Sequence, residues 1–318
     1  MPSPDARDER VEVIARNLRV DGATAEVLHA LSEAGVQARL LKGPTLARWL
    51  YDRDDPRSYG DSDLLVAPAD VSLAGAVLES LGFSPRLDAS RMPDWWREHA
   101  SEWWREKDAA LVDLHRTLPG LGVDDDTAWR VLSEENDVLV VAERPARCLA
   151  LPARALHVVL HAAQHGAGWA RPHEDLRRLL RRGDEDLLEQ AATLAARLGA
   201  TDAFATGLRL VPEGRAVADR LTLPANASVD ATLRAGGAPR QALSFEQLHR
   251  ADSTRARVAF IWSKFVPPVA FMRHWWPPAA QRRRSLVAAY VWHRPRWLLR
   301  TAPSAFRAWR RARHDARG

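Results

Sequence analysis

Two aspartates separated by one residue are the first feature of the sequence that could support chemistry. Asp61 and Asp63 open the apolar run 61–66, which is predicted to form a strand. Side chains alternate along a strand, so both carboxylates are expected on the same face. Two carboxylates so close repel each other and favour a bound cation, and their hard oxygens suit Mg²⁺. Asp113, in the predicted strand 109–115, is the best-placed third ligand for a two-metal site.

A second group of residues, which precedes the aspartates, could hold the phosphates of a nucleotide. The apolar run 36–41 predicts a strand that passes through Lys42 and Gly43 into a helix over 44–52. Glycine lets a phosphate approach the backbone closely, and the start of a helix offers free N–H groups. Lys42 would add a positive charge and Thr45 a hydroxyl group. Together with the carboxylates, this order of residues predicts phosphoryl or nucleotidyl transfer.

Each of these signals also has an ordinary structural explanation. The pair Asp61 and Asp63 can arise by chance, and Lys42 can be a solvated strand end. Gly43 can serve an ordinary turn, and Asp113 can cap a hairpin or pair with an arginine. It is their combination, in this order and on these predicted elements, that favours the chemical interpretation.

The elements expected to position these residues alternate as in an α/β fold. The first part of the chain is predicted to contain helices over 8–34, 44–52, 69–81 and 125–134 and strands over 36–41, 61–66, 109–115 and 137–142, with further strands within 84–117. Helical periodicity then continues over 153–165, 173–182, 184–198 and 200–211. We therefore expect an α/β domain over residues 1–150 and a mainly helical domain over residues 151–318.

Several short motifs follow one another along the chain in a recognisable order. They are LLKGPTLARWLY (40–51), Arg57, GDSDLLV (60–66), LGF (81–83), DLH (113–115), a histidine-rich stretch (160–165) and an acidic-leucine stretch (175–180). In this order they resemble the uncharacterised bacterial nucleotidyltransferase family within the DNA polymerase β-like superfamily. The resemblance covers most of residues 30–185 and is strongest over 40–83.

This resemblance implies a fold, an activity and a set of metal ligands. The fold would be a polymerase β-like nucleotidyltransferase domain with a mixed sheet (α/β, or α+β), followed by a mainly helical domain. Asp61 and Asp63 would bind both of two Mg²⁺ ions, and Asp113 would bind the ion that activates the acceptor hydroxyl. The reaction would transfer a nucleoside monophosphate from a nucleoside triphosphate (NTP) to a hydroxyl group and release pyrophosphate.

The resemblance also implies roles for the residues around the predicted phosphate site. Gly43 and Thr45 would hold the β- and γ-phosphates of the NTP, and Lys42 and Arg57 would assist them. The wider superfamily has a glycine-serine pair after the first strand, whereas this chain has Gly43-Pro44-Thr45. Thr45 would therefore do the work of the serine from one position later.

Neither the residues nor the resemblance identifies the acceptor, which could be a small molecule, a protein or RNA. One alternative is a non-catalytic protein that binds a nucleotide or a partner on a degenerate transferase fold. A second alternative is a transferase that modifies tRNA, as toxins of this superfamily do. The basic C-terminal segment gives weak support to the tRNA interpretation.

The composition is that of a globular protein of 318 residues, with 46% hydrophobic and 27% charged residues. No apolar run approaches the roughly 18 residues of a membrane-spanning helix, so integral membrane association is not expected. The lone cysteine, Cys148, excludes a disulfide framework and is expected to be a small buried hydrophobe. Because the N-terminal residues lack the apolar segment of a secretory signal, we expect a cytoplasmic protein.

Residues 282–318 are strongly basic, with eleven arginines and one acidic residue, Asp315. Aromatic residues lie among the arginines, including Trp292, Trp297, Phe306 and Trp309. Such a segment could bind RNA, with an affinity that falls steeply with salt, or the surface of an anionic membrane. The favoured expectation is a third one, in which the aromatic residues pack onto the helical domain and the arginines are solvated or paired with the acidic body.

Histidines and tryptophans offer further candidate sites. His157, His161 and His165 are spaced by four residues and form one line along a predicted helix, which could bind zinc. A structural role where the two domains meet is the expectation for them and for His173 and Asp175. The tryptophan pairs 95–96, 103–104 and 275–276 could stack on bases, but the first two are expected to pack in the core or between the domains.

Overall fold

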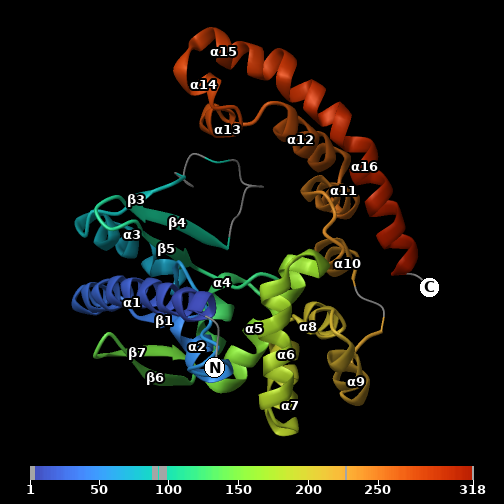
Figure 1. The fold of residues 1–318 in the computed structure, drawn as a ribbon. Helices are drawn as coiled ribbons and strands as arrows, with labels where there is room; N and C mark the ends of the chain where they lie inside the picture. The colour runs from blue at the N-terminus through green and yellow to red at the C-terminus, as the bar shows by residue number, and fades with distance from the viewer. Residues whose placement is uncertain (1–3, 88–91, 93–98, 226–227, 317–318) are drawn as a thin grey trace.

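A seven-stranded mixed sheet lies at the centre of the N-terminal part of the computed structural model (Figure 1). The structure describes residues 4–87, 92, 99–225 and 228–316. The strands are β1 (Ala38–Leu40), β2 (Ser62–Val66), β3 (Ser84–Pro85), β4 (Ala100–Arg105), β5 (Ala110–His115), β6 (Asn136–Val141) and β7 (Arg144–Leu149). Their order across the sheet is β3-β4-β5-β2-β1-β7-β6, with β2/β5 and β1/β7 parallel and the other neighbours antiparallel.

Both faces of this sheet are covered by helices. Successive residues of a strand point to opposite faces, so Leu64 and Leu65 of β2 join different apolar clusters. The cluster of Leu64 also contains side chains of α1 (Pro4–Glu33) and α3 (Val71–Ser80). The cluster of Leu65 contains side chains of α2 (Pro44–Leu50), α4 (Asp125–Ser133) and α5 (Leu151–His165).

Helices make up the rest of the chain, which confirms the expected mixed α/β fold followed by a mainly helical region. After α5 come α6 (Ala170–Arg182), α7 (Glu185–Arg197), α8 (Thr201–Leu208) and α9 (Pro212–Arg220). Then follow α10 (Val229–Ala235), α11 (Arg240–Arg250), α12 (Thr254–Phe265), α13 (Val269–Trp275), α14 (Pro278–Gln281), α15 (Arg283–Ala288) and α16 (Arg294–Asp315). Short 3₁₀ turns are η1 (Pro68–Asp70) and η3 (Gly166–Gly168), and η4 (Ala289–His293) is π-helical. Among the described residues, no helix combines the length and apolar character needed to cross a membrane.

The larger apolar cluster joins residues from the two sides of position 150. Leu46 and Leu50 of α2 pack in the same cluster as Leu156 of α5 and Phe204 of α8. Nine residues of α5 are buried, which makes this helix the main link between the sheet and the later helices. The division of the chain into domains over 1–150 and 151–318 therefore stays a prediction, with a core shared across it.

Residues 229–315 extend away from the sheet as a curved arrangement of helices that we call the arm (Figure 1). We call residues 4–225 the body. The arm has two small apolar clusters of its own, one around Leu233 and Ala305 and one around Phe271 and Met272. It meets the body where α10 contacts α5 and α8.

Strand β7 is an element that the sequence pattern does not predict. Arg144 and Arg147 interrupt its apolar residues, but they are exposed while Ala146 and Cys148 are buried. The β6–β7 turn also lacks a glycine. Its positive φ angles, 45° and 63°, are adopted by Ala142 and Glu143 instead. Cys148 is a buried hydrophobe, as expected.

The two tryptophan pairs of the N-terminal part have different outcomes. Trp103, in β4, is buried, and its ring lies 3.2 Å from where a Cβ on Gly75 of α3 would be. The packing expectation therefore holds for Trp103, whose ring fills space between the sheet and α3. Trp95 and Trp96 lie outside the described residues.

Candidate active site

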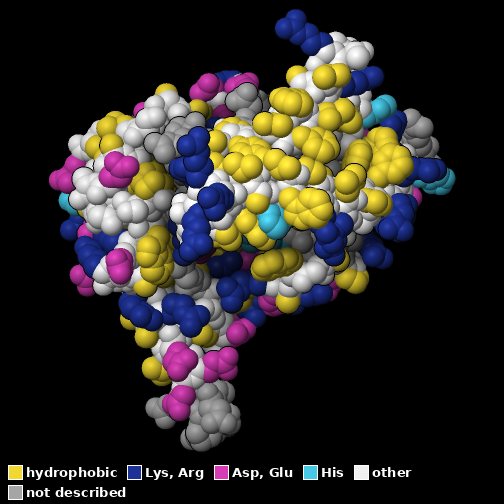
Figure 2. Space-filling view, turned by 90° about the horizontal axis from the view of Figure 1, so that it is seen from above, with side chains coloured by type: hydrophobic (Ala, Val, Ile, Leu, Met, Phe, Trp, Pro, Cys, Tyr) yellow, Lys and Arg dark blue, Asp and Glu magenta, His cyan; other side chains and the backbone are white. Residues whose placement is uncertain are grey.

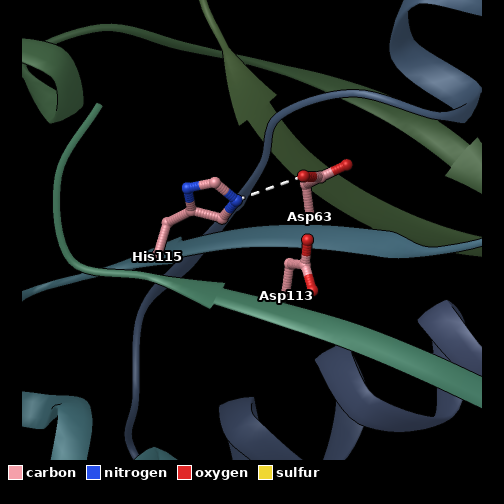
Figure 3. Close-up of side chains that lie close together, drawn as sticks. All are labelled: Asp63, Asp113 and His115. Carbon is pink, nitrogen blue, oxygen red and sulfur yellow. Dashed lines mark hydrogen bonds and ion pairs between the residues drawn. The ribbon is translucent and has the colours of Figure 1, made fainter. Parts of the chain in front are cut away.

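The two strands that carry the predicted carboxylates lie side by side. In the parallel pair β2–β5, Asp63 is in register with Asp113 and Leu65 with His115. Alternation places all four side chains on the sheet face that α2 and α5 cover. Figure 3 shows the side chains of Asp63, Asp113 and His115 converging in this region. Ligand atoms of these three residues lie within 4.8 Å of one another.

Asp63 is the electrostatic centre of the site. Its carboxylate is 1% exposed, and its Oδ1 lies 2.8 Å from Lys42 Nζ and 3.1 Å from His115 Nε2. Burial by itself favours the neutral acid. The Lys42 ammonium and the His115 imidazole outweigh burial and hold the pKa of Asp63 far below its usual range.

The other two carboxylates behave in the opposite way. Burial, followed by the negative charges of Asp63 and Asp61, raises the pKa of Asp113 to about 7. Burial and Asp63 also raise the pKa of Asp61, which directly precedes β2. Asp113 Oδ1 is buried and has no hydrogen-bond partner. Three carboxylates thus lie near the positive charge of Lys42, with Arg57 acting more weakly on Asp61, and a further cation would be stabilised among them.

Lys42 lies in the turn between β1 and α2 and remains charged although it is largely buried. Burial lowers the pKa of its ammonium, but Asp63, and more weakly Asp61 and Asp113, raise it by more. Its expected role in binding phosphates stays a prediction, and the structure places Lys42 beside a buried carboxylate. Its hydrogen bond to Asp63, rather than to solvent, distinguishes it from a solvated strand end.

Gly43 and Thr45 occupy the turn into α2. Gly43 has φ 63° and precedes Pro44, the first residue of the helix, so the turn uses a backbone conformation that favours glycine. Thr45 is buried, and its hydroxyl donates to the carbonyl oxygen of Leu41 at 2.8 Å. In this geometry the hydroxyl proton is committed to Leu41 and does not point toward a phosphate.

Arg57 lies in a buried ion pair. Its Nε donates to Asp175 Oδ1 at 2.9 Å, and its Nη2 donates to Asp175 Oδ2 at 2.8 Å. The hydroxyl of Tyr51 donates to the same Oδ1 at 2.6 Å. Burial lowers the pKa of Arg57, but the bonds to Asp175 outweigh it and raise that pKa. Arg57 thereby ties the loop after α2 to α6, and Asp175 has the structural role expected of it.

A row of rings on α5 continues from this site. The ring centroids of His157 and His161 are 6.2 Å apart, those of His161 and His165 4.5 Å, and those of His165 and Trp169 5.1 Å. Burial, helped by the charge of Lys42, lowers the pKa of His157 to about 3. The same causes lower the pKa of His161, so these imidazoles are neutral. In the described part of the chain, this row does not form a metal-ligand group of the kind found at Asp63, Asp113 and His115.

Sequence reasoning gives no role to two histidines of this site. His115 follows Asp113 by two residues, so alternation along β5 would have placed it on the same face. His99 lies beside it, with ring centroids 5.4 Å apart, because β4 pairs with β5. Burial, with the charges of His115 and Lys42, lowers the pKa of His99 to about 4. No spacing rule connects His99 to the site, since the strand pairing brings it there.

The sequence profile of a protein family described as "Uncharacterised nucleotidyltransferase" matches residues 4–214. The chain belongs to this nucleotidyltransferase family. The matched region extends from α1 into α9 and contains each site residue discussed above, whereas the arm lies beyond it. The protein is therefore a transferase by family, as its motif order predicts. No curated protein matches the sequence.

Solved structures that are similar to this nucleotidyltransferase include two of the antibiotic-resistance factor ANT(2'')-Ia. Its solution structure is 20% identical, with a TM-score of 0.39 over 55% of this chain and 90% of that chain. A crystal structure of it with adenylyl-2''-tobramycin is 18% identical, with a TM-score of 0.37 over 54% and 94%. An antigenic nucleotidyltransferase-like protein from Paracoccidioides brasiliensis is 14% identical, with a TM-score of 0.35 over 57% and 93%. At these TM-scores, the assignment rests on the family match.

Proposed function

We propose that this protein is a Mg²⁺-dependent nucleotidyltransferase that moves a nucleoside monophosphate from an NTP to a hydroxyl group. The acceptor oxygen would form a bond to the α-phosphorus while the bond from that phosphorus to the bridging oxygen of the β-phosphate breaks. Pyrophosphate would leave with the electron pair of the broken bond. The family assignment supports the reaction class, and the site supports the details.

The observation that carries the proposal is the register of β2 against β5. It brings Asp63 opposite Asp113 on a covered face of the sheet, and Asp61, just before β2, is coupled electrostatically to both. Burying three carboxylates together is unfavourable unless cations accompany them. Such an arrangement is typical of sites that bind divalent metal and phosphate groups.

The donor set fits Mg²⁺. Carboxylate oxygens are its preferred protein ligands, and Asp113 Oδ1 is a buried acceptor that lacks a partner. Asp61, Asp63 and Asp113 would hold the metal, two ions in the full site, while His115 keeps Asp63 oriented through its Nε2. Bound Mg²⁺ would neutralise phosphate charge and lower the pKa of the acceptor hydroxyl.

The residues of the β1–α2 turn would bind the triphosphate. Lys42 would supply a point charge to the phosphates, and Gly43 would allow the backbone to approach them closely. Thr45 would donate to a phosphate oxygen only once its hydroxyl turns away from the carbonyl oxygen of Leu41. Arg57 would act at longer range, since its Nε and Nη2 already donate hydrogen bonds to Asp175.

Transfer of label from α-³²P-labelled NTPs in the presence of Mg²⁺ tests this function. Each of the four NTPs would be incubated with the protein and with small-molecule, RNA and protein fractions, and label on each fraction and released pyrophosphate would be measured. Asp63→Asn and Asp113→Asn should each lower transfer at least about a hundredfold, because each removes an anionic ligand of the Mg²⁺ that would neutralise the phosphates.

Asp70→Asn is the matched control. Asp70 follows the other end of β2, in η1, so the same chemical change occurs away from the site. It should keep wild-type transfer. Wild-type transfer by Asp63→Asn or Asp113→Asn, in a protein with an unchanged melting temperature, would refute the two-metal assignment. NTP binding without transfer to any fraction would favour a non-catalytic nucleotide-binding protein instead.

A further inference from the structure

The arm has an unusual distribution of charge. Residues 253–314 contain thirteen arginines and Lys264 but no aspartate or glutamate. Within the described residues, none of the ion pairs joins an arginine of 254–313 to a carboxylate. Within the described part of the chain, these arginines are thus not paired with the acidic body, and the favoured expectation allows this, since it has them either solvated or paired.

Helix α12 carries an apolar stripe that faces solvent. Val258, Ile261, Trp262 and Phe265 follow the spacing i, i+3, i+4 and i+7 and therefore lie on one side of the helix. All four are exposed, Trp262 by 66%, and α12 has no buried residue. Exposed apolar residues at single positions are common, but a complete helical stripe indicates a surface that another body covers.

A second exposed stripe runs along η4 and α16. Trp292, Leu299 and Phe306 recur every seven residues, and their exposed fractions are 62%, 71% and 40%. Val287 and Val291 precede them and are exposed as well. Figure 2 looks down on the arm and shows hydrophobic side chains gathered in a broad area with Lys and Arg side chains along its borders.

Other aromatic residues of the same segment are used for packing. Trp297 packs edge-on against Trp275 and under Arg294, and Trp309 Nε1 donates to the buried Glu246 of α11 at 2.8 Å. For Trp297 and Trp309, the expectation that tail aromatics pack within the helical region therefore holds. Trp292 contradicts it, because its indole is mostly exposed.

The helices that bear the two stripes are fixed to each other. Arg294 Nε donates to the carbonyl oxygen of Lys264, at the end of α12, at 3.0 Å. Tyr290 Oη donates to the carbonyl oxygen of Pro267 at 2.5 Å. The exposed stripes therefore belong to the folded helices of the arm rather than to an unfolded tail.

A pocket lies beside the second stripe. It has a volume of about 560 Å³, and its lining residues are Trp275, Trp276, His293, Arg296, Trp297, Arg300 and Thr301. Arg296 and Arg300 are exposed and lie one helical turn apart, next to Trp292 and Leu299 on the helix surface. The pocket thus combines an aromatic wall with two guanidinium groups, which suit a phosphate group attached to an apolar body.

We propose that the arm docks onto the surface of an anionic lipid bilayer. Exposed tryptophans would lie at the level of the headgroups, the aliphatic stripes would enter the acyl boundary, and the arginines would face anionic headgroups. Arg296 and Arg300, at the mouth of the Trp pocket, would receive a headgroup phosphate.

The chemistry of the stripes separates this partner from two others. RNA would bind through the arginines and the aromatic rings but would leave Val258, Ile261 and Leu299 in water. Neither a base nor a phosphate makes favourable contacts with exposed aliphatic side chains. A second copy of this chain, docked through the same surface, would place arginines opposite arginines, since residues 253–314 contain no carboxylate. A bilayer with anionic lipids matches both the charge and the aliphatic residues.

Flotation of the full-length protein with lipid vesicles tests the proposal without any need for the acceptor or for activity. The vesicles would be phosphatidylcholine alone or phosphatidylcholine with about one-third phosphatidylglycerol. We expect binding to the anionic vesicles and at least about tenfold less binding to the neutral ones. Raising the salt from about 0.1 M to about 0.5 M should weaken binding without abolishing it, because the apolar contribution is not screened.

Two sets of variants distinguish the apolar and ionic contributions. The triple variant Trp262→Ser/Trp292→Ser/Leu299→Ser should lower vesicle binding at least about tenfold. Val138→Ser/Val140→Ser is its control, because these valines are exposed on β6 in the body. Arg296→Glu/Arg300→Glu should abolish the preference for anionic vesicles, whereas Arg19→Glu/Arg53→Glu makes the same charge change in the body and should not.

Three outcomes would overturn the proposal. The first is equal binding of the wild type and the apolar triple variant to anionic vesicles. The second is salt-sensitive binding to a mixed-sequence RNA with no binding to vesicles, which would favour the RNA interpretation. The third is a dimer in sedimentation that the triple variant converts into a monomer, with no binding to vesicles. Melting temperatures would show that each variant remains folded.

Discussion

At the scale of single residues, the site is organised by one lysine and three carboxylates. Lys42 keeps Asp63 ionised, while Asp113 and Asp61 hold their protons more strongly than usual. A bound divalent cation would replace those protons and add to the charge that Lys42 already supplies. The spacing of Asp61 and Asp63 predicts their common face, but it contains no information about the lysine that reaches Asp63.

The neutral histidines of α5 make folding sensitive to pH. His157 is buried, and its pKa lies near 3 in the folded protein, against an ordinary value of 6.5. The unfolded chain therefore takes up a proton as the pH falls through 6.5, whereas the folded protein does not until about pH 3. The stabilisation is complete above pH 6.5 and is lost progressively below it. We expect the free energy of unfolding to fall by about 1.4 kcal/mol per pH unit for each such histidine.

Urea unfolding of the wild type and His157→Gln between pH 6.5 and pH 5 measures this dependence. The free energy of unfolding of the variant should depend less steeply on pH than that of the wild type. The difference between the two slopes should correspond to the uptake of about one proton, whatever the absolute stability of the variant. His314→Gln, at a position whose side chain is 92% exposed, is the control and should retain the wild-type slope. Equal slopes for His157→Gln and the wild type would show that His157 is charged or solvated in the folded protein.

At the scale of elements, strand pairing and one ion pair assemble the site. The parallel pairing of β2 with β5 sets Asp113 opposite Asp63. The bond between Arg57 and Asp175 then joins the loop after α2 to α6 across 118 positions of the chain. This ion pair holds the helical region against the same face of the sheet that carries the carboxylates.

Loss of one partner of this ion pair should be costly. Arg57→Ala leaves the carboxylate of Asp175, 1% exposed, without its counter-charge, and should lower the free energy of unfolding by about 3–5 kcal/mol. Chemical denaturation measures the change. Arg220→Ala is the control, since its ion pair with Glu185 is exposed and its loss should cost less than about 1 kcal/mol. Similar effects of the two substitutions would contradict a structural role for Arg57.

At the scale of the whole molecule, the body and the arm have separate apolar clusters. The two larger clusters and the residues packed against them end at Leu223, and the two smaller clusters lie almost entirely within the arm. The family match ends at residue 214, before the arm begins. The arrangement suggests a transferase body to which the arm adds a site of attachment.

A protein shortened to residues 1–225 should therefore keep its fold and lose the attachment surface. We expect a cooperative thermal transition and NTP binding close to those of the full chain, because both larger clusters remain intact. Binding to anionic vesicles should disappear. Circular dichroism, NTP titration and vesicle flotation measure these three properties. An unfolded shortened protein would show instead that α10 is needed to complete the surface of α5 and α8.

Local patterns in the sequence predict the elements well where periodicity is strong. Helices α1, α5 and α7 lie close to their predicted ranges, and the strand with Asp61 and Asp63 forms as expected. These elements depend on contacts within a few residues, so alternation and helical spacing are sufficient. Strand β7 is not predicted, because its arginines interrupt the apolar residues and its turn contains no glycine. The alternation of buried and exposed residues along β7 is visible only in the structure.

The chemical class of this protein follows from the sequence, because the order of the lysine, glycine and aspartate motifs is itself local information. The partners of those residues are decided by the tertiary structure. His115 and Lys42 meet on Asp63, and Arg57 turns toward Asp175, because strand register and helix packing bring distant positions together. The sequence likewise shows how basic the C-terminal segment is. Which of its tryptophans face water depends on the packing of α16 against α11 and α13, and packing of that kind has no signature in spacing alone.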